Sequence, residues 1–446
     1  MTSTYYQLAL MIAGIGLIVW ATAVKKWNAF FALLIAALFV AIFSGMHLAD
    51  IAASLKKGFG QTMEKIGLLI LLGTTLGVIL EKTGATVSMA NAILRRVNEK
   101  NAPAAISIIG FIIGLPIFCD SGFIILNGLN HSLVRKSAYK MPVMAVALAT
   151  SLYAVHCLVP PHPGITAAVG TAGADIGMVM LFGIALSIPA ALFGYFWSIR
   201  RRKNMHSADN NLMHEEEIFP QLPSVTMSFL PVILPILLIS LKSILLQTGI
   251  AGIDANSILL RIVSFSGEPV IALMAGIVSS LFLIGKTNKK EIGHWLNAGV
   301  EKAGTILAII AAGGMFGEIL MATGMGKNLG ILLSGFSFGI FFPFLIAAIL
   351  KTAQGSSTVA VITSASIVVP MLGDLGLQSS MGVTLSVLSM GAGSMVISHA
   401  NDAYFWVISR FSQLDTSVTL RVYSMATLWM GALVQFFIWL LSLFLL

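Results

Sequence analysis

The stretch Val155-His156-Cys157-Leu158-Val159-Pro160-Pro161-His162-Pro163-Gly164 stands inside an otherwise apolar run that extends from residue 141 to 169. Three prolines within four residues cannot continue a helix, because each removes a backbone donor and clashes with the preceding turn. The run is long enough to cross a bilayer, so the sequence predicts a membrane-spanning helix that is broken in its middle. Irregular backbone at membrane depth is tolerated only where it lines a cavity or meets a ligand. This segment therefore predicts a site for a solute.

The composition of the whole chain indicates a membrane protein. Hydrophobic residues make up 57% of the 446 residues, charged residues make up only 10%, and the mean hydropathy is +0.93. A soluble domain could not hide so much apolar surface, so the bilayer is the expected solvent. The first apolar stretch ends at Lys25 and Lys26, whereas a cleaved signal peptide begins with its basic residues, so we expect a retained span. The apolar stretches that could cross lie near 5–24, 28–46, 66–82, 141–169, 175–199, 226–247, 259–284, 303–322, 381–409 and 423–446.

Three further interruptions accompany the proline-rich one. Phe118-Cys119-Asp120-Ser121-Gly122 lies in a glycine-interrupted piece near 103–133, and Lys351-Thr352-Ala353-Gln354-Gly355-Ser356-Ser357-Thr358 lies in a similar piece near 329–372. We interpret both pieces as re-entrant hairpins. The fourth interruption, Ser398-His399-Ala400-Asn401-Asp402, breaks the span near 381–409.

The order of these features repeats along the chain. Glu64-Lys65-Ile66-Gly67 recurs as Glu301-Lys302-Ala303-Gly304, and His162 lies 237 positions before His399. We therefore predict an all-α polytopic protein built from two repeats, 1–199 and 224–446, which are joined by a polar cytoplasmic linker at 200–223. Each repeat holds about five spans, a re-entrant hairpin and a broken helix. An odd number of spans inverts the second repeat, and inverted repeats with interrupted segments are typical of secondary transporters.

The basic residues predict the orientation. Placing the N-terminus outside puts most of the 26 lysines and arginines on the cytoplasmic side, as the positive-inside rule requires. We expect a multi-pass protein of the cell inner membrane with both termini on the periplasmic side. The formal charge of +8 then reflects topology, and it does not indicate a nucleic-acid partner.

Ionisable and hydroxyl side chains at the interruptions are the candidate functional residues, since an intramembrane charge is expensive. Asp120 and Asp402 predict function, although both could instead cap a helix. His162 predicts function too, although it could be a buried histidine that merely donates a hydrogen bond to a carbonyl. For His156 a functional role and a structural role stay equally open. The hydroxyls of Ser356, Ser357 and Thr358 fit ligand contact or capping. Lys351 could attract an anion or pair with a carboxylate, and Glu318 is a weaker candidate for a proton.

Other chemistries lack their motifs. Gly285-Lys286-Thr287 resembles the end of a phosphate loop, but Ser280 stands where its first glycine belongs, and His214-Glu215 lacks the second histidine of a zinc protease. Cys119 and Cys157 have no metal-ligand or redox spacing. We expect no enzyme, no catalytic residue, no metal and no cofactor. A passive channel and an intramembrane enzyme that uses Ser121 and His162 are the alternatives.

At its four interruptions the chain resembles the gluconate permease (GntP) family of proton-coupled symporters. The resemblance rests on the segment 156–164, on Ala174-Asp175-Ile176-Gly177, on Ala353-Gln354-Gly355-Ser356 and on Ser398-His399-Ala400-Asn401-Asp402. It implies import of an aldonate or a similar hydroxy acid with H⁺ as the coupling ion. It also implies a fold like the ion-transporter superfamily, with a scaffold and a mobile domain, and a homodimer in the bilayer.

Combined with this resemblance, the residues predict a binding mode for a small anionic, gluconate-like solute. Its carboxylate would meet backbone amides and hydroxyls at the second hairpin, and its hydroxyls would meet Ser121, His162 and Asn401. The proton would bind Asp120 or Asp402, whose charged forms a low dielectric disfavours, with Glu318 as a third candidate. The predicted substrate-binding residues are Ser121, Gly122, Pro161, His162, Gly164, Gly355, Ser356, Ser357, Thr358, His399 and Asn401.

One departure from the family pattern concerns the substrate. Family members carry Glu-Val-Gly at the first hairpin tip, whereas this chain has Asp120-Ser121-Gly122. The carboxylate is one methylene shorter, and a hydroxyl is added. Because the family carries gluconate, idonate, other sugar acids and D-serine, a permease for D-serine or another small hydroxylated carboxylate is the alternative to a sugar-acid importer.

Overall fold

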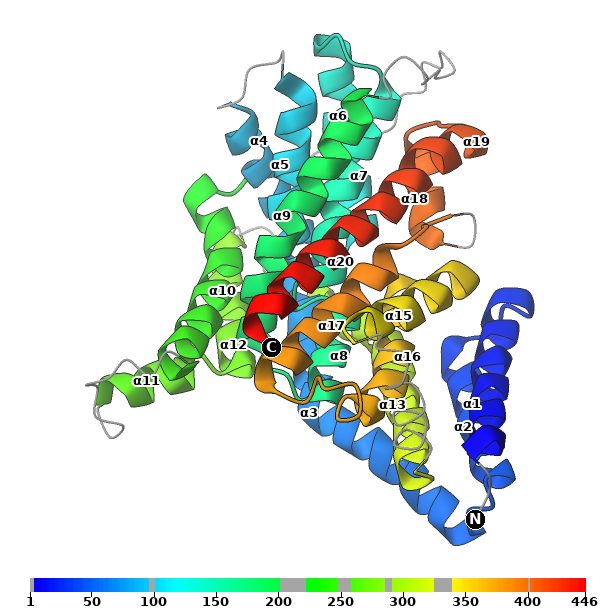
Figure 1. The fold of residues 1–446 in the computed structure, drawn as a ribbon. Coiled ribbons are helices and arrows are strands. Elements are labelled where there is room, and N and C mark those ends of the chain that lie inside the picture. Colours follow the sequence, from blue (N-terminus) through cyan, green and yellow to red (C-terminus); the bar gives the residue numbers. More distant parts are fainter. Residues whose placement is uncertain are drawn as a thin grey trace.

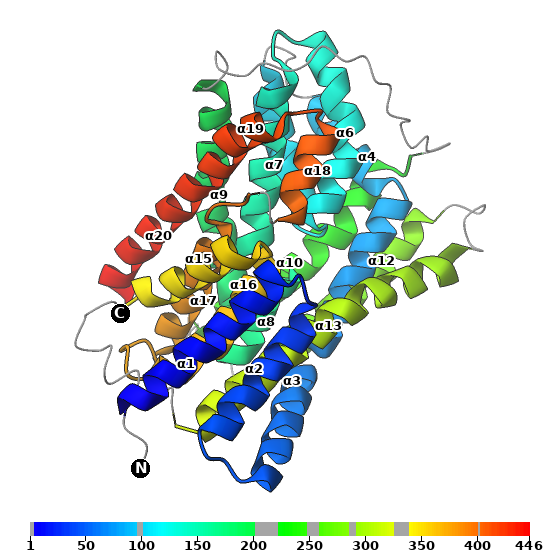
Figure 2. The same cartoon turned by 90° about the vertical axis from the view of Figure 1, so that its right-hand side faces the viewer.

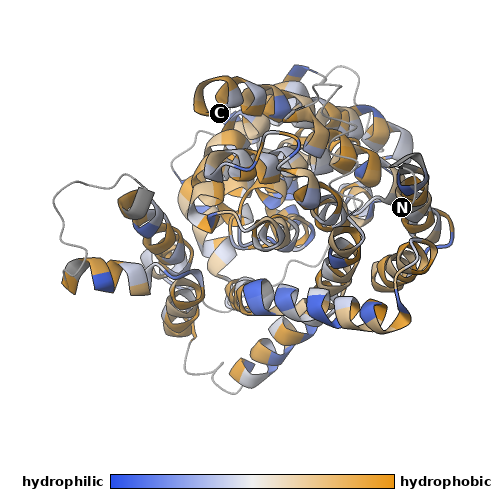
Figure 3. Ribbon diagram, turned by 60° about the horizontal axis from the view of Figure 1, so that its bottom comes forward, coloured by the Kyte–Doolittle hydropathy of each residue, from blue (hydrophilic) through white to orange (hydrophobic). Residues whose placement is uncertain are grey.

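The structure is a computed structural model that describes residues 4–95, 101–200, 222–247, 258–284, 291–324, 339–399 and 402–446. Most of the predicted linker, residues 329–338 of the second predicted hairpin, and Asn401 lie outside the described residues. In the described part all regular secondary structure is helical, and no strand is formed. Hydrophobic colouring dominates its helices (Figure 3). The all-α class is thus confirmed.

Five described helices are long and apolar enough to cross a membrane, or seven if each of two bent helix pairs counts as one span. Among them, 94% of the residues in an 18-residue window of Met141–Ala172 are buried within the protein, whereas the share in such a window of Thr416–Leu445 is only 28%. A span that neighbouring helices enclose so completely is at the centre of the fold, and the proline-rich break lies in it. The number of spans per half and their inverted arrangement stay predictions.

Two helices at the N-terminal end lie beside the rest of the molecule and lead into a long bent helix, which a short helix follows (Figures 1 and 2). They are α1 (Thr4–Val19), which continues as a π-helical turn (Trp20–Val24), α2 (Ala29–Phe43), α3 (Leu48–Lys82) and α4 (Ala85–Leu94). The Asn28 side chain caps α2 by accepting a bond from the Phe30 amide at 2.9 Å.

Helix α3 begins far earlier than its predicted span near 66–82, because it crosses α13 (Ile292–Ala322) at very close range. A Cβ atom on Gly58 would lie 2.4 Å from the Gly314 carbonyl oxygen. Glycines thus let the two backbones meet, as small residues do between membrane helices. Helix α3 bends by 48° between Lys65 and Gly67. The bend separates its polar first part from its apolar second part.

The apolar stretch predicted as one span near 259–284 consists of two helices that meet at 71°. They are α11 (Ile258–Ser266) and α12 (Pro269–Ser280), and a 3₁₀ turn (Leu281–Leu283) follows them. Pro269 has no amide hydrogen to continue a helix and holds the preceding residue in extended conformation. Figure 1 shows α11 projecting away from α10 (Val225–Gln247) and α12.

The remaining helices surround the four interruptions. In the first half they are α5 (Ala102–Gly114), α6 (Cys119–Lys136), α7 (Met141–Leu158), α8 (Pro163–Ala172) and α9 (Ile176–Arg200). In the second half they are α15 (Phe341–Gln354), α16 (Ser357–Val368) with a 3₁₀ turn (Val369–Met371), α17 (Ser380–Met395), α18 (Ala403–Phe411), α19 (Thr416–Thr419), a π-helical turn (Leu420–Ser424) and α20 (Met425–Leu445). Helix α16 packs against α8 and α13, and α17 packs against α7 and α8 (Figure 2). This packing brings interruptions from both halves of the sequence together.

Candidate functional site

A cavity of about 380 Å³ with both polar and apolar lining residues lies where the starts of α6, α16 and α18 meet α7 and α13. Its volume lies in the range of sites for small molecules. The residues that line it are Phe118, Cys119, Asp120, Tyr153, His156, Pro163, Lys302, Ile306, Ile309, Ser356, Ser357, Thr358, Val359, Ile362, Asp402, Ala403 and Tyr404. Five of the predicted site residues are among them, and they come from three of the four interruptions.

The turn between α5 and α6 places a carboxylate in this cavity. Asp120 is in the first turn of α6, its side chain is exposed, and its Oδ1 accepts a bond from the Ser121 amide at 2.9 Å. A negative charge is favourable at a helix N-terminus. No described cation lies within ion-pair distance of Asp120. Ser121 does not line the cavity, and its hydroxyl accepts a bond from Lys302 Nζ at 2.9 Å.

The turn between α15 and α16 places hydroxyls and a helix N-terminus at the same cavity. Gly355 has a φ of +94°, which a residue with a side chain rarely adopts. Ser356 then caps α16 by accepting a bond from the Val359 amide at 3.3 Å. Ser356, Ser357 and Thr358 all line the cavity. The amide groups in the first turn of α16 lack helical partners, so this end can bind an anion.

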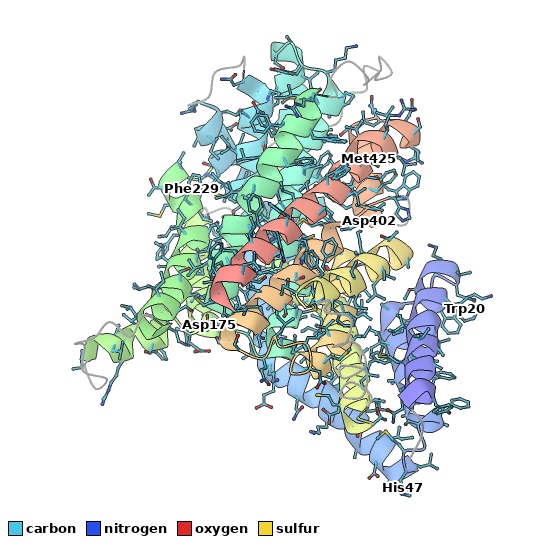
Figure 4. The ribbon with its side chains drawn as sticks, in the orientation of Figure 1. Trp20, His47, Asp175, Phe229, Asp402 and Met425 are labelled. Atoms are coloured by element: carbon cyan, nitrogen blue, oxygen red, sulfur yellow. The ribbon has the colours of Figure 1, made fainter. Side chains whose placement is uncertain are left out.

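Lys351 is fully buried and pairs with a carboxylate. Its Nζ lies 2.6 Å from Asp402 Oδ2 and also donates to the Gly355 carbonyl. Asp402, labelled in Figure 4, caps α18 by accepting a bond from the Tyr404 amide at 3.0 Å, and it accepts another from the Ser398 hydroxyl. The positive charge of Lys351 is therefore neutralised within the protein, as a buried charge requires.

His162 and His399 bind backbone carbonyls rather than line the cavity. The Nε2 atom of His162 lies 2.7 Å from the Gly114 carbonyl oxygen, and that of His399 lies 2.9 Å from the Thr352 carbonyl oxygen. Since a carbonyl only accepts, both Nε2 atoms donate. Each histidine thus ties a broken helix to the hairpin of its own half.

His156 lines the cavity although the sequence alone left its role open. Its side chain is buried, its Nδ1 has no hydrogen-bond partner among the residues that the structure describes, and its ring stacks on Tyr153 with centroids 6.4 Å apart. Its position inside the proline-rich interruption was the feature of the sequence that could have indicated a place in the site. Tyr153 and Tyr404 also line the cavity, and nothing in their sequence context distinguishes them from core aromatics.

Four other predicted residues do not line this cavity. Pro161 lines a separate apolar cavity of about 20 Å³, and Gly122 packs on Leu152 of α7. A Cβ on Gly164 would lie 3.0 Å from Thr358 Cα, so this glycine allows α8 to approach α16. Glu318 is buried on α13, with Lys57 Nζ at 2.7 Å from its Oε1.

Lys302 is the charged lining residue that the sequence did not predict as part of a site. The predicted span begins at residue 303, whereas α13 begins at Ile292, so Lys302 lies well inside the helix. The recurrence of Glu64-Lys65 as Glu301-Lys302 marked this position as part of the repeat without indicating a cavity.

Residues 6–444 match the family model described as GntP family permease. The chain belongs to the GntP permease family. The resemblance predicted from the interruptions is thus confirmed. GntP permeases are transport proteins and not enzymes, so the alternative of an intramembrane enzyme is excluded, and the chain is a multi-pass membrane protein.

Three permeases and transporters of related sequence align with this GntP permease over nearly its whole length. A gluconate permease of Pseudomonas aeruginosa is 33% identical over 450 residues, with 98% of each chain covered. A gluconate permease of Bacillus licheniformis is 29% identical over 93% of this chain and 95% of its own. The Gnt-II system L-idonate transporter of Escherichia coli is 28% identical over 94% of each chain.

A solved structure shares the fold of this GntP permease. It is Neisseria gonorrhoeae MtrF, described as illuminating a class of antimetabolite efflux pumps. It aligns with a TM-score of 0.66 over 94% of this chain and 97% of its own, at 16% identity. At this identity the likeness concerns the fold alone.

Proposed function

We propose that this GntP permease imports gluconate or a closely related sugar acid together with a proton. The substrate class rests on the gluconate permeases and the L-idonate transporter to which the chain is similar. The cavity between α6, α7, α13, α16 and α18 is the binding site in this proposal. Its hydroxyls and helix N-terminus suit an anion that carries hydroxyl groups.

The observation that carries the proposal is the meeting of Asp120 with the start of α16 in one cavity. The substrate carboxylate binds at the amides and hydroxyls of Ser356, Ser357 and Thr358, where the helix dipole favours negative charge. Asp120 takes the proton. It suits this role better than Asp402 or Glu318, because Lys351 and Lys57 already neutralise those two carboxylates.

The wider transport cycle in this proposal uses the predicted inverted repeats. The α5–α6 and α15–α16 hairpins re-enter from opposite sides of the inner membrane, and the loaded site moves past a scaffold that includes α3 and α13. Both termini face the periplasm, as the positive-inside rule favours. The permease acts as a homodimer.

The test is uptake of labelled gluconate into proteoliposomes with an imposed inward proton gradient. We expect uphill accumulation, with competition by four- to six-carbon sugar acids ranked above competition by D-serine. Stronger competition by D-serine would instead identify the alternative substrate. Saturable counterflow separates a carrier from a passive channel.

Asp120→Asn is the matching variant for proton coupling. It removes the protonatable group while keeping the shape of the side chain. We expect uphill uptake to be lost, whereas exchange of labelled for unlabelled gluconate continues. Unchanged uphill uptake in this variant would refute the role of Asp120 and leave the substrate class standing.

A further inference from the structure

Lys302 brings a positive charge into the cavity from α13. It lies on one face of this helix with Ile306 and Ile309, which also line the cavity. Residues four and three positions apart share a helix face. The lining also includes Val359 and Ile362 of α16, which packs against α13. Lys302 therefore shares a cavity with the start of α16, where an anion is expected.

The contacts of Lys302 leave its charge uncompensated. Its Nζ donates to Ser121 Oγ at 2.9 Å and lies 4.7 Å from the centroid of the Phe118 ring. No described carboxylate lies within 4.0 Å of it. By contrast, Lys57, Lys242 and Lys351 each have a carboxylate oxygen within 2.7 Å. A half-buried ammonium group whose contacts within the described part of the chain are a hydroxyl and an aromatic ring is poised for an anion.

We propose that Lys302 is the counter-charge for the substrate carboxylate, which replaces Ser121 as its hydrogen-bond acceptor. This inference rests on the proposed function and adds the residue that recognises the acid group. A bond between an ammonium group and a carboxylate is roughly twice as strong as one to a neutral acceptor, so an entering acid displaces the hydroxyl. Because Ser121 and Phe118 are at the α5–α6 turn, this exchange also releases α13 from the hairpin tip.

The charges of the cavity balance before and after binding. In the empty site Lys302 is positive and Asp120 is negative. In the loaded site the substrate anion accompanies Lys302, while Asp120 carries the imported proton. One anion with one proton thus keeps the net charge of the two residues and their ligands unchanged. A low-dielectric surrounding disfavours any net charge, so both partners travel together.

The experiment compares gluconate with its neutral amide, D-gluconamide, as inhibitors of labelled uptake in proteoliposomes. In Lys302→Gln we expect the inhibition constant of gluconate to rise by about 10- to 100-fold, which corresponds to the loss of a hydrogen bond to a charged group. The constant for gluconamide should change by less than about twofold. Lys302→Arg keeps the charge and should restore most of the preference for the acid.

Lys242→Gln is the matched control, since it also removes a lysine from a membrane helix. Lys242 pairs with Glu268 away from the cavity, so both inhibition constants should stay at wild-type values. If Lys302→Gln takes up gluconate like the wild type and the ratio of its two inhibition constants is unchanged, the proposal for Lys302 is overturned. The proposed function would still stand in that case. A wild-type protein that neither takes up nor binds any acid contradicts the proposed function as well. Size-exclusion profiles of each variant before reconstitution identify any loss of folding. If Lys302→Gln does not fold, the test rests on Lys302→Arg, which should keep most of the preference for gluconate over gluconamide.

Discussion

The break between α7 and α8 and the break between α17 and α18 lie 237 positions apart and share one device. In each, a histidine donates through Nε2 to a carbonyl at the C-terminal end of the first hairpin helix, at 2.7 Å for His162 and 2.9 Å for His399. The two halves differ in their charges. The second break holds the buried pair of Lys351 and Asp402, whereas the positions 237 residues earlier are Gly114 and Ile165.

This difference separates two tasks. In the second half the ion pair holds the end of α15 to the start of α18, and it leaves the cavity little free charge from either residue. In the first half the hairpin tip carries Asp120, which faces the cavity with no described cation within 4.0 Å of its carboxylate. Both breaks are therefore held by the same kind of histidine-to-carbonyl bond. The buried ion pair makes the second half rigid, whereas Asp120 equips the first half to exchange a proton.

Removal of Lys351 should have the largest effect on stability. In Lys351→Met the carboxylate of Asp402 stays buried without its cation, so we expect the free energy of unfolding to fall by about 3–5 kcal/mol. The measurement is thermal unfolding in detergent, followed by size exclusion. The double variant Lys351→Met/Asp402→Asn should recover much of the loss, because the neutral amide no longer needs a counter-charge.

Asp120→Asn is the control from the first half. Its carboxylate is exposed and unpaired among the described residues, so its removal should change the free energy of unfolding by less than about 0.5 kcal/mol. If Lys351→Met unfolds at the wild-type temperature, or if Asp120→Asn is equally destabilising, the assignment of rigidity to the second half fails.

Loss of either histidine bond should lower the free energy of unfolding by an amount between the effects of Lys351→Met and Asp120→Asn. The loss should be larger for His162 than for His399. His162 is buried, so His162→Leu leaves the Gly114 carbonyl without a partner and should cost about 1–3 kcal/mol. His399 is partly exposed, so water can replace it, and His399→Leu should cost about 0.5–1.5 kcal/mol. Thermal unfolding of both variants in one detergent is the measurement. An equal or larger loss of unfolding free energy in His399→Leu would show that the strength of these histidine-to-carbonyl bonds does not depend on burial.

Local chemistry explains why the positions of the breaks could be predicted from the sequence. Prolines 160, 161 and 163 and the positive φ of Gly355 end helices whatever surrounds them. Ser356 directly follows Gly355, and it lines the cavity as predicted, as do Asp120 and Asp402 of two other interruptions.

Packing between distant segments explains what the sequence could not provide. Lys302 meets Ser121 across 181 positions, and this contact depends on where α13 crosses the α5–α6 turn. The early start of α3 depends on the close crossing of Gly58 and Gly314. Whether His162 binds a ligand or a carbonyl was likewise open until the position of Gly114 was known.

The smallest effect on stability, and the sharpest test of the first break, concerns His156. Its ring centroid lies 4.8 Å from that of His162, yet His156 faces the cavity with Nδ1 unpaired, whereas His162 binds a carbonyl. His156→Leu removes an unpaired buried polar atom, so its free energy of unfolding should stay within about 0.5 kcal/mol of wild type. The KM for gluconate should rise by about 3- to 10-fold, as expected for the loss of one neutral hydrogen bond to the substrate.

His162→Leu should show the opposite pattern, with a lower unfolding temperature and a KM within about twofold of wild type. The two variants remove the same side chain six positions apart, so each serves as the control for the other. A lower unfolding temperature and an unchanged KM in His156→Leu would assign both histidines to the framework. The cavity would then recognise substrate hydroxyls through the second half alone, and the division of tasks between the two breaks would be reversed.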